Sequence, residues 1–509
     1  MTAIVEELRP ARLLLLCALM LGLAADWLLR AGPWRLGLLV WVLLAVLAAI
    51  VCRRTTVDGV DVGSPKAASS SWRNDSYLLL GATVVTVSGL IGSTAEPLYA
   101  LTFLASLMFA ALVAWHGRGR LVEVRISDLM ITPLRAAYAS AIGAPVFLMH
   151  EMGSLGIRLG RRGRQLVVGA VLAVPPFLIV GALLLNADPV FERLAGAWTS
   201  VLFEDAIEHA LFIGTFAWLA GGWLRSIARP VVFPIGIPDA DELRPKSDFL
   251  IVAPALGAVA TLLTLYLAVQ ARALFGGPEY VQLMSGLSYA EYARQGFFGL
   301  AVVAAIVLSL LLIADWVIDH TDQRAVRRFR ALGWVLLALV AVLVASAAYR
   351  MLLYVQFFGL SSARLYASAF MLWTALALIW CGATVMRGRR DRFGVGVLVL
   401  SAAWLLTLHL VNPDSLVARV NLQRAIDGHP LDVPYHASLS ADALPAILAG
   451  APLLNAGECT ALMTQLHAVW APRLEKRRGA DWRTWSIPVA RAEVLMDRSA
   501  KNVIARHCR

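Results

Sequence analysis

The chain has 509 residues, of which 59% are hydrophobic and only 16% are charged, and its formal net charge is +11. Globular chains in water are about 45–50% apolar and about 25% charged, and one soluble core does not hold this much apolar surface. The composition therefore excludes a water-soluble globular protein and predicts a membrane protein.

Uncharged apolar stretches long enough to cross a bilayer recur along the chain. A helix crosses the hydrocarbon core with about 20 residues. Eleven spans are predicted, at 13–29, 36–52, 77–95, 97–115, 165–187, 207–224, 249–271, 295–314, 331–349, 365–386 and 393–411. The first contains Asp26 and the sixth begins with Glu208 and His209. We expect the first span to be retained rather than cleaved as a signal peptide, since Glu6 and Glu7 precede it.

The basic residues indicate how the spans are oriented. Lys and Arg are more frequent in the cytoplasmic loops of membrane proteins. Alternate loops hold 26 and 7 of them, and the other 12 follow residue 411. The N-terminus is therefore expected in the cytoplasm of a bacterial cell, and the C-terminus is expected outside the inner membrane.

Two segments outside the bilayer are long enough to be structured. Residues 116–164 mix apolar residues with arginine and are predicted to form an amphipathic basic segment that lies on anionic lipid, with an ordinary solvated loop as the alternative. Residues 412–509 are predicted to form a small α-helical domain, separate from the membrane domain 1–411.

Helix start and stop signals divide residues 412–509, which we call the tail. Asn412 before Pro413 is typical of a capped helix start, and Gly428 with Pro430 is typical of a helix end. Further helices are predicted at 433–439, 442–448 and 458–475. Cys459 and Cys508 are the only two cysteines in the tail, and outside the cytoplasm they are candidates for a disulfide.

The densest polar patch falls on the predicted outer face. Glu291 and Arg294 are flanked by tyrosines, which also fit the aromatic belt at a membrane surface. We expect a docking surface or ligand cleft between the bundle and the tail. Its candidate residues are Tyr289, Glu291, Tyr292, Arg294, Arg350, Arg364, Arg419 and Asn421.

A second polar cluster lies at the cytoplasmic end of the eighth span. Asp315 and Asp319 are one helical turn apart, and carboxylates in membranes sometimes relay protons. Their position near the headgroups favours simple pairing with arginine instead. No catalytic motif is found, and we expect no metal site, no cofactor and no enzymatic activity.

Several short motifs resemble a known family. They are ADPVF at 187–191, GLSYAEYARQGFF at 286–298, RMLLYVQFFGLSSARLYA at 350–367, NPDSLVARVNLQRA at 412–425, LDVPYHASLSADALPAIL at 431–448 and DWRTW at 481–485. Together they resemble the bacterial multi-pass membrane family described as a domain of unknown function, the 4153/4173 group. The resemblance covers about residues 187–485 and implies an integral inner-membrane protein, with no established reaction, substrate or catalytic residue.

The expected role is a non-enzymatic signalling or envelope-assembly component. Its outer face and tail would dock or sense an envelope or signalling protein, and the bilayer is its other partner, with no nucleic acid. A secondary transporter of a small solute is the first alternative, although Pro175 and Pro176 make the only mid-span break in the sequence. The second alternative is a membrane glycosyl or lipid transferase, for which Asp26 is the only support.

Overall fold

The computed structural model describes residues 2–30, 32–57, 70–115, 126–151, 204–228, 248–275, 297–477, 479–501 and 508, with a few isolated positions between 162 and 180. All regular elements in these residues are helices.

In the described part of the chain, eleven long helices precede the tail. They are α1 (Thr2–Leu29), α2 (Leu36–Val57), α3 (Ser70–Gly92), α4 (Glu96–Trp115), α5 (Ile126–Glu151), α8 (Glu204–Ala228), α9 (Phe249–Phe275), α12 (Phe297–Val317), α13 (Gln323–Phe358), α14 (Ser362–Thr384) and α15 (Phe393–Val411). Among the described residues, nine helices are long and apolar enough to cross a membrane, and the apolar part of α12, Val302–Val317, is shorter. The prediction of an all-α multi-pass membrane protein is confirmed.

Ten of the eleven predicted spans fall on these helices, while 165–187 lies almost wholly outside the described residues. Helix α5 comes from the segment predicted to lie on the membrane surface. Leu129, Thr132 and Ala139 on this helix are buried, whereas Met130 and Leu134 are 70% and 73% exposed. One face of α5 therefore packs into the bundle, and its other face presents apolar side chains outward.

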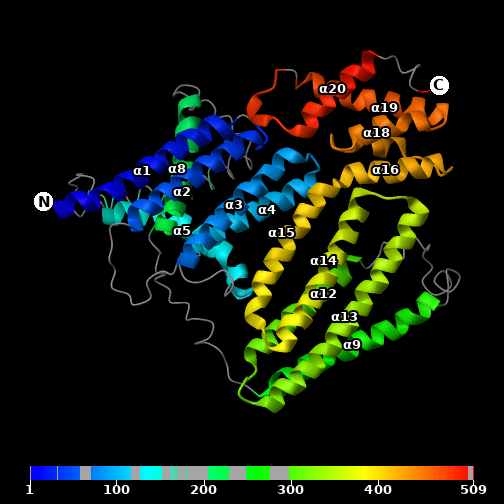
Figure 1. The fold of residues 1–509 in the computed structure, drawn as a ribbon, viewed down its shortest axis with the longest axis horizontal. Helices are drawn as coiled ribbons and strands as arrows, with labels where there is room; N and C mark the ends of the chain where they lie inside the picture. Colours follow the sequence, from blue (N-terminus) through cyan, green and yellow to red (C-terminus); the bar gives the residue numbers. More distant parts are fainter. Residues whose placement is uncertain are drawn as a thin grey trace.

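The long helices form two groups, which Figure 1 shows with α15 between them. The first group contains α1 to α5 and α8, and the second contains α9, α12, α13 and α14. Helix α15 packs Val395 and Leu398 against the core of the first group, and Phe393 and Val397 against the core of the second. The two groups thus share α15 as a common wall.

Glycine allows the closest helix crossing in the first group. A Cβ atom on Gly222 of α8 would lie only 2.1 Å from the carbonyl oxygen of Ser140 on α5. A Cβ on Gly143 would likewise lie 2.7 Å from the Cα of Gly222. Small residues at such crossings let two backbones approach and are common where helices pack in membranes.

The polar residues of the two weakest predicted spans pair with each other. His209 Nδ1 of α8 lies 2.5 Å from Asp26 Oδ2 of α1, and Arg30 lies 3.5 Å from Glu208. Pairing lowers the cost of placing these groups near apolar surroundings. The two helices therefore enter the bundle with their polar ends side by side.

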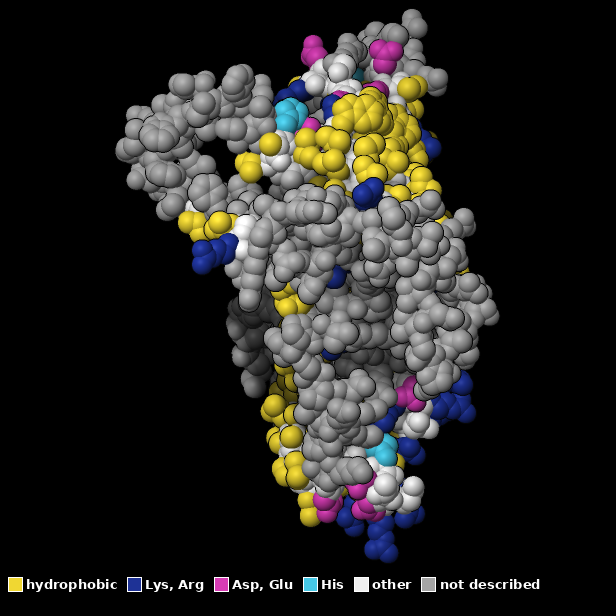
Figure 2. Space-filling view, turned by 90° about the vertical axis from the view of Figure 1, so that its left-hand side faces the viewer, with side chains coloured by type: hydrophobic (Ala, Val, Ile, Leu, Met, Phe, Trp, Pro, Cys, Tyr) yellow, Lys and Arg dark blue, Asp and Glu magenta, His cyan; other side chains and the backbone are white. Residues whose placement is uncertain are grey.

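Charged side chains gather at the end of the molecule opposite the tail. Figure 2 shows Lys, Arg, Asp and Glu at that lower end, with hydrophobic side chains above them. The exposed residues there include Arg324, Arg327 and Arg328 at the start of α13, and Arg387 and Arg389 after α14. Two short 3₁₀ helices, η4 (Val385–Arg387) and η5 (Arg390–Arg392), make the turn between α14 and α15.

The tail is a stack of short helices over one end of both groups (Figure 1). It contains α16 (Pro413–Ile426), α17 (Val433–Ser438), α18 (Leu444–Gly450), η6 (Ala451–Leu453), α19 (Ala456–Glu475), η7 (Trp482–Thr484) and α20 (Ile487–Lys501). The cap at Asn412 is present, with its side chain accepting a hydrogen bond from the Ser415 N–H. Among the α-helices described in the tail, the sequence patterns predicted α16 to α19 but not α20.

The tail has its own apolar core and one cross-link. Val417, Leu444, Leu462 and Leu466 are fully buried in this core. Cys459 and Cys508 form a disulfide in the structure, with 5.6 Å between their Cα atoms. The bond ties the last described residue to the first turn of α19.

Candidate docking site between the tail and the membrane helices

The predicted docking residues fall into two sets. Tyr289, Glu291, Tyr292 and Arg294 lie outside the described residues. The other four are described: Arg350 is buried in α13, Arg364 is in the first turn of α14, and Arg419 and Asn421 are on α16. Arg364 and Asn421 meet at the turn between α13 and α14, while Arg419 is exposed on the tail surface.

Asn421 holds the turn between α13 and α14 from the tail. Its Oδ1 accepts a hydrogen bond from the Leu360 N–H at 2.8 Å, and its Nδ2 donates to the Leu360 carbonyl at 2.6 Å. Gly359 has φ +75°, and a Cβ there would lie 2.8 Å from Asn421 Oδ1. The turn therefore needs glycine both for its backbone conformation and for the close approach of the amide.

Asp414 contacts Ser362, at the end of the same turn. Its Oδ1 accepts a hydrogen bond from Ser362 Oγ at 2.8 Å, and its Oδ2 accepts one from the Ser440 N–H at 3.2 Å. Tyr435 Oη accepts a further bond from the Ser362 N–H at 2.8 Å. The first turn of α14 is thus tied to α16, α17 and the segment after α17.

Asp442 makes the densest contact between the tail and the first helix group. Its Oδ2 accepts hydrogen bonds from the Thr94 N–H at 2.6 Å and from Thr94 Oγ1 at 2.7 Å. Ser93 Oγ and Ser440 Oγ lie 3.3 and 3.2 Å from the same oxygen, and Asn412 Nδ2 donates to Oδ1 at 3.3 Å. Only 4% of Asp442 is exposed, so this carboxylate exchanges water for donors on the turn between α3 and α4.

Arg35 holds the turn between α3 and α4 through two backbone carbonyls. Its Nη1 donates to the carbonyls of Leu90 and Ser93 at 3.0 and 2.8 Å, and its guanidinium lies over the Tyr99 ring. Burial, as the largest cause, lowers the pKa of Arg35. Since α3 ends at Gly92, the guanidinium also interacts favourably with the carbonyl end of this helix.

The third contact joins η7 to the last turn of α1. The Arg483 side chain hydrogen-bonds to the Trp27 carbonyl and forms an ion pair with Asp481. The Trp27 and Trp482 rings lie 5.7 Å apart. The hydrogen bond from the Arg483 side chain is the largest cause that lowers the pKa of Asp481. We call these three contacts, to residues 27–37, 93–95 and 358–362, the tail joint.

The predicted relay residues lie on the opposite end of the molecule. Asp315 Oδ1 lies 3.3 Å from His320 Nε2, and Asp315 Oδ2 lies 3.8 Å from Arg390 Nη1. Asp319 accepts hydrogen bonds from the N–H and hydroxyl of Thr321. These contacts join the end of α12 and the turn after it to the turn before α15.

Sequence reasoning missed most of the tail joint. Asp442, Asp414 and Asn412 lie in the motifs that resembled a family, but their partners are as far as 349 residues away in the chain. A polar residue inside an otherwise apolar helix stack is the available signal, because buried polar groups need partners. In the contacts described, the carboxylates of Asp442 and Asp414 accept hydrogen bonds that attach the tail to the membrane helices.

A comparison with family models gives one match. The model described as a domain of unknown function (DUF4153) matches residues 76–450. The match begins well before residue 187 and ends before the DWRTW motif, which corrects the extent expected from the sequence motifs at both ends. No curated protein and no solved structure matches the chain. Because the match covers well over half of the 509 residues, the chain belongs to the DUF4153 family.

Proposed function

We propose that this integral membrane protein is a non-enzymatic docking component of the bacterial cytoplasmic membrane. The tail presents a surface to an envelope or signalling protein. The membrane helices hold that surface at the bilayer and respond when it is occupied.

One observation carries the proposal: the tail joint spans both helix groups. Asn421 and Asp414 attach the tail to the turn between α13 and α14 in the second group. In the first group, Asp442 attaches it to the turn between α3 and α4, and Arg483 attaches it to the last turn of α1. A partner that shifts the tail therefore acts on both groups at once, through contacts that have a defined geometry.

The orientation is part of the proposal. The end opposite the tail carries exposed arginines at the start of α13 and after α14, which favours that end as the cytoplasmic one. The N-terminus is then cytoplasmic and the tail extracytoplasmic. A disulfide between Cys459 and Cys508 agrees with an oxidising compartment outside the cytoplasm.

Site-specific photocrosslinking in intact cells tests the role. A photoreactive amino acid is placed at Leu453, which is on the tail and 66% exposed, and separately at Arg419. The matched control is Leu262 on α9, which is also 66% exposed but lies on a membrane helix. We expect one discrete protein adduct from the tail positions only, and the same adduct when the identified protein is purified and mixed with this one.

Two results contradict the proposal. The first is crosslinking at Leu453 and Arg419 that yields only the lipid adducts seen at Leu262. The second is a solute-dependent proton or sodium flux in liposomes that contain this protein alone, which favours the transporter. Orientation is tested separately with a periplasm-active phosphatase fused after Arg509, where enzyme activity is expected.

A further inference from the structure

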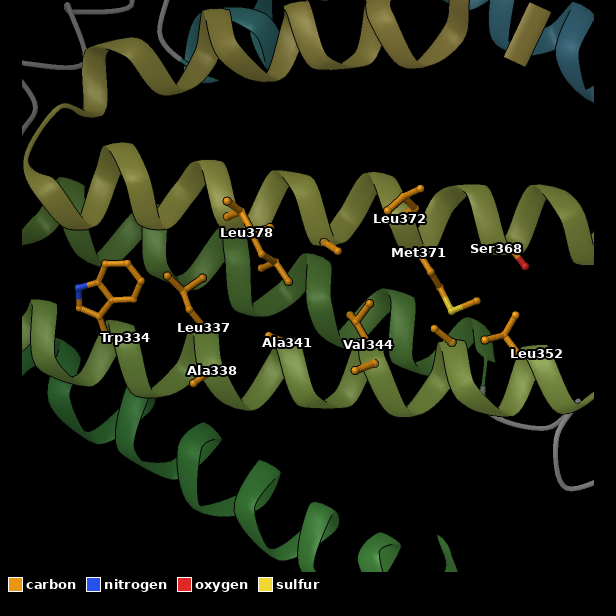
Figure 3. Close-up of a pocket in the computed structure, with 14 residues that line it drawn as sticks. Trp334, Leu337, Ala338, Ala341, Val344, Leu352, Ser368, Met371, Leu372 and Leu378 are labelled. Atoms are coloured by element: carbon orange, nitrogen blue, oxygen red, sulfur yellow. The ribbon is translucent and has the colours of Figure 1, made fainter. Parts of the chain in front are cut away.

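An apolar groove runs along the outer surface of the second helix group, between α13 and α14. Figure 3 shows its lining side chains, among which Leu337, Val344 and Met371 point into the space between the two helices. The groove has a volume of about 510 Å³. Its α13 side includes Ala338, Ala341, Ala345 and Ala348, and the first three are exposed. Short side chains in one row therefore leave the backbone of α13 as the floor of the groove.

The length of the groove fits the thickness of a bilayer core. The lining runs from Trp334 to Leu352 on α13, which is about 27 Å at 1.5 Å per residue and close to the ~30 Å of a bilayer core. The alanine row from Ala338 to Ala348 is about 15 Å long, which is half of this thickness and about the depth that one acyl chain occupies in one leaflet. In the bilayer, lipid tails are the solvent that fills such a space.

The tail end of the groove carries positive charge. On α14 the row that contains Ser368, Leu372, Ala375 and Ile379 continues one turn back to Arg364, and Ser368 Oγ donates to the Arg364 carbonyl. On α13 the row continues from Leu352 to Gln356. The groove therefore opens at its tail end between Gln356 and Arg364.

A second guanidinium converges on the same place. Arg364 Nη1 donates to the carbonyls of Phe358 and Gly359, and its guanidinium lies 4.1 Å from the Tyr354 ring centroid. Arg424 Nη1, from the tail, donates to the Gln356 carbonyl at 2.7 Å. Within the described part of the chain, neither arginine forms an ion pair with a carboxylate. A guanidinium has five N–H donors, so these contacts leave others for an anion.

We propose that this groove binds one anionic phospholipid, with an acyl chain along the alanine row and the headgroup phosphate at Arg364 and Arg424. The positive charge at the mouth matches the negatively charged headgroup of this lipid, and the apolar lining of the groove matches its acyl chain. The site joins α13, α14 and the tail helix α16, so the bound lipid bridges the tail and the second helix group.

Native mass spectrometry of the full-length protein tests the site. The protein is reconstituted with equimolar phosphatidylglycerol and phosphatidylcholine, extracted in mild detergent, and its retained lipids are counted and identified. We expect one retained phosphatidylglycerol. The double variant Arg364→Gln, Arg424→Gln is expected to lower the ratio of retained phosphatidylglycerol to phosphatidylcholine at least tenfold. Arg419→Gln, an exposed arginine on the same helix as Arg424, is expected to leave it unchanged.

A second variant separates the groove from the charges. Ala345→Leu fills an exposed groove position and is expected to remove the retained lipid without disturbing the core. Ala331→Leu, exposed on α13 but outside the groove lining, is the matched control. An unchanged lipid ratio in the arginine variant, or a retained lipid in Ala345→Leu, overturns the proposal. So does a dimer that Ala345→Leu abolishes while the lipid count stays constant, since the groove then binds a second copy.

Discussion

Replacing Asp442 by asparagine tests the tail joint at its most buried charge. The variant keeps the shape of the side chain but removes the charge that Thr94 and Asn412 face. The Asn412 amide cannot simply turn over, because its Oδ1 caps the Ser415 N–H. Hydrogen bonds to a charged group contribute about 1.5–3 kcal/mol, so Asp442→Asn is expected to weaken the joint by about that amount.

Hydrogen exchange measures this change directly, because the Thr94 N–H is itself a donor to Asp442. A loss of about 1.5–3 kcal/mol is a roughly 10- to 150-fold faster exchange in the peptide that contains Thr94, when exchange follows the opening equilibrium. Asp427→Asn, on the exposed surface of the tail, is the control and is expected to change nothing in that peptide. If both variants left the exchange of Thr94 as it is in the unaltered protein, the assigned role of Asp442 would be wrong.

Three further perturbations have directions that the structure sets. Gly222→Ala places a Cβ 2.1 Å from a backbone oxygen and is expected to lower the stability by about 1–3 kcal/mol, measured by thermal unfolding. Gly257→Ala is the control, because its Cβ would meet nothing within 4 Å. Equal effects of the two variants would contradict the tight crossing of α5 and α8. Cys459→Ser with Cys508→Ser removes the disulfide, which links residues 49 positions apart and restricts the unfolded chain. The loss is expected to destabilise the tail by up to about 4 kcal/mol and to speed its proteolysis. An unchanged rate of proteolysis would argue against the bond. Burial is the largest cause that lowers the pKa of His436, so the folded tail disfavours the protonated ring, and tail stability should fall as pH drops below the ordinary value of 6.5. Melting scans between about pH 7.5 and 5.5 should show a shallower decline for His436→Gln, and an identical decline would contradict this.

The sequence was sufficient for the parts of the fold that depend on local or periodic signals. Apolar length alone located ten spans that fall on described helices, and the Asn412–Pro413 pair marked the start of α16. These features follow from the thickness of the bilayer and from capping, which act on neighbouring residues.

Features that depend on contacts between residues far apart in the chain could not be predicted from local sequence patterns. The burial of one face of α5 depends on Gly143 and Gly222, which a linear pattern does not relate. The tail joint similarly depends on Asp442 meeting Thr94, and the α13–α14 groove on alanines whose neighbours come from another helix. Asn421 and Arg364 were among the predicted docking residues, but the glycine turn that both of them contact emerged only from the three-dimensional arrangement.

The contact between Arg483 and Trp27 joins residues 456 positions apart, which orders events during biosynthesis. Residue 27 leaves the ribosome long before residue 483, so α1 and α2 must be inserted and must wait through the translation of every later helix before η7 reaches them. Until then the Trp27 ring lacks its partner Trp482. Closure of η7 over the end of α1 therefore comes after every membrane helix has been translated, which makes it a late step in the assembly of the bundle.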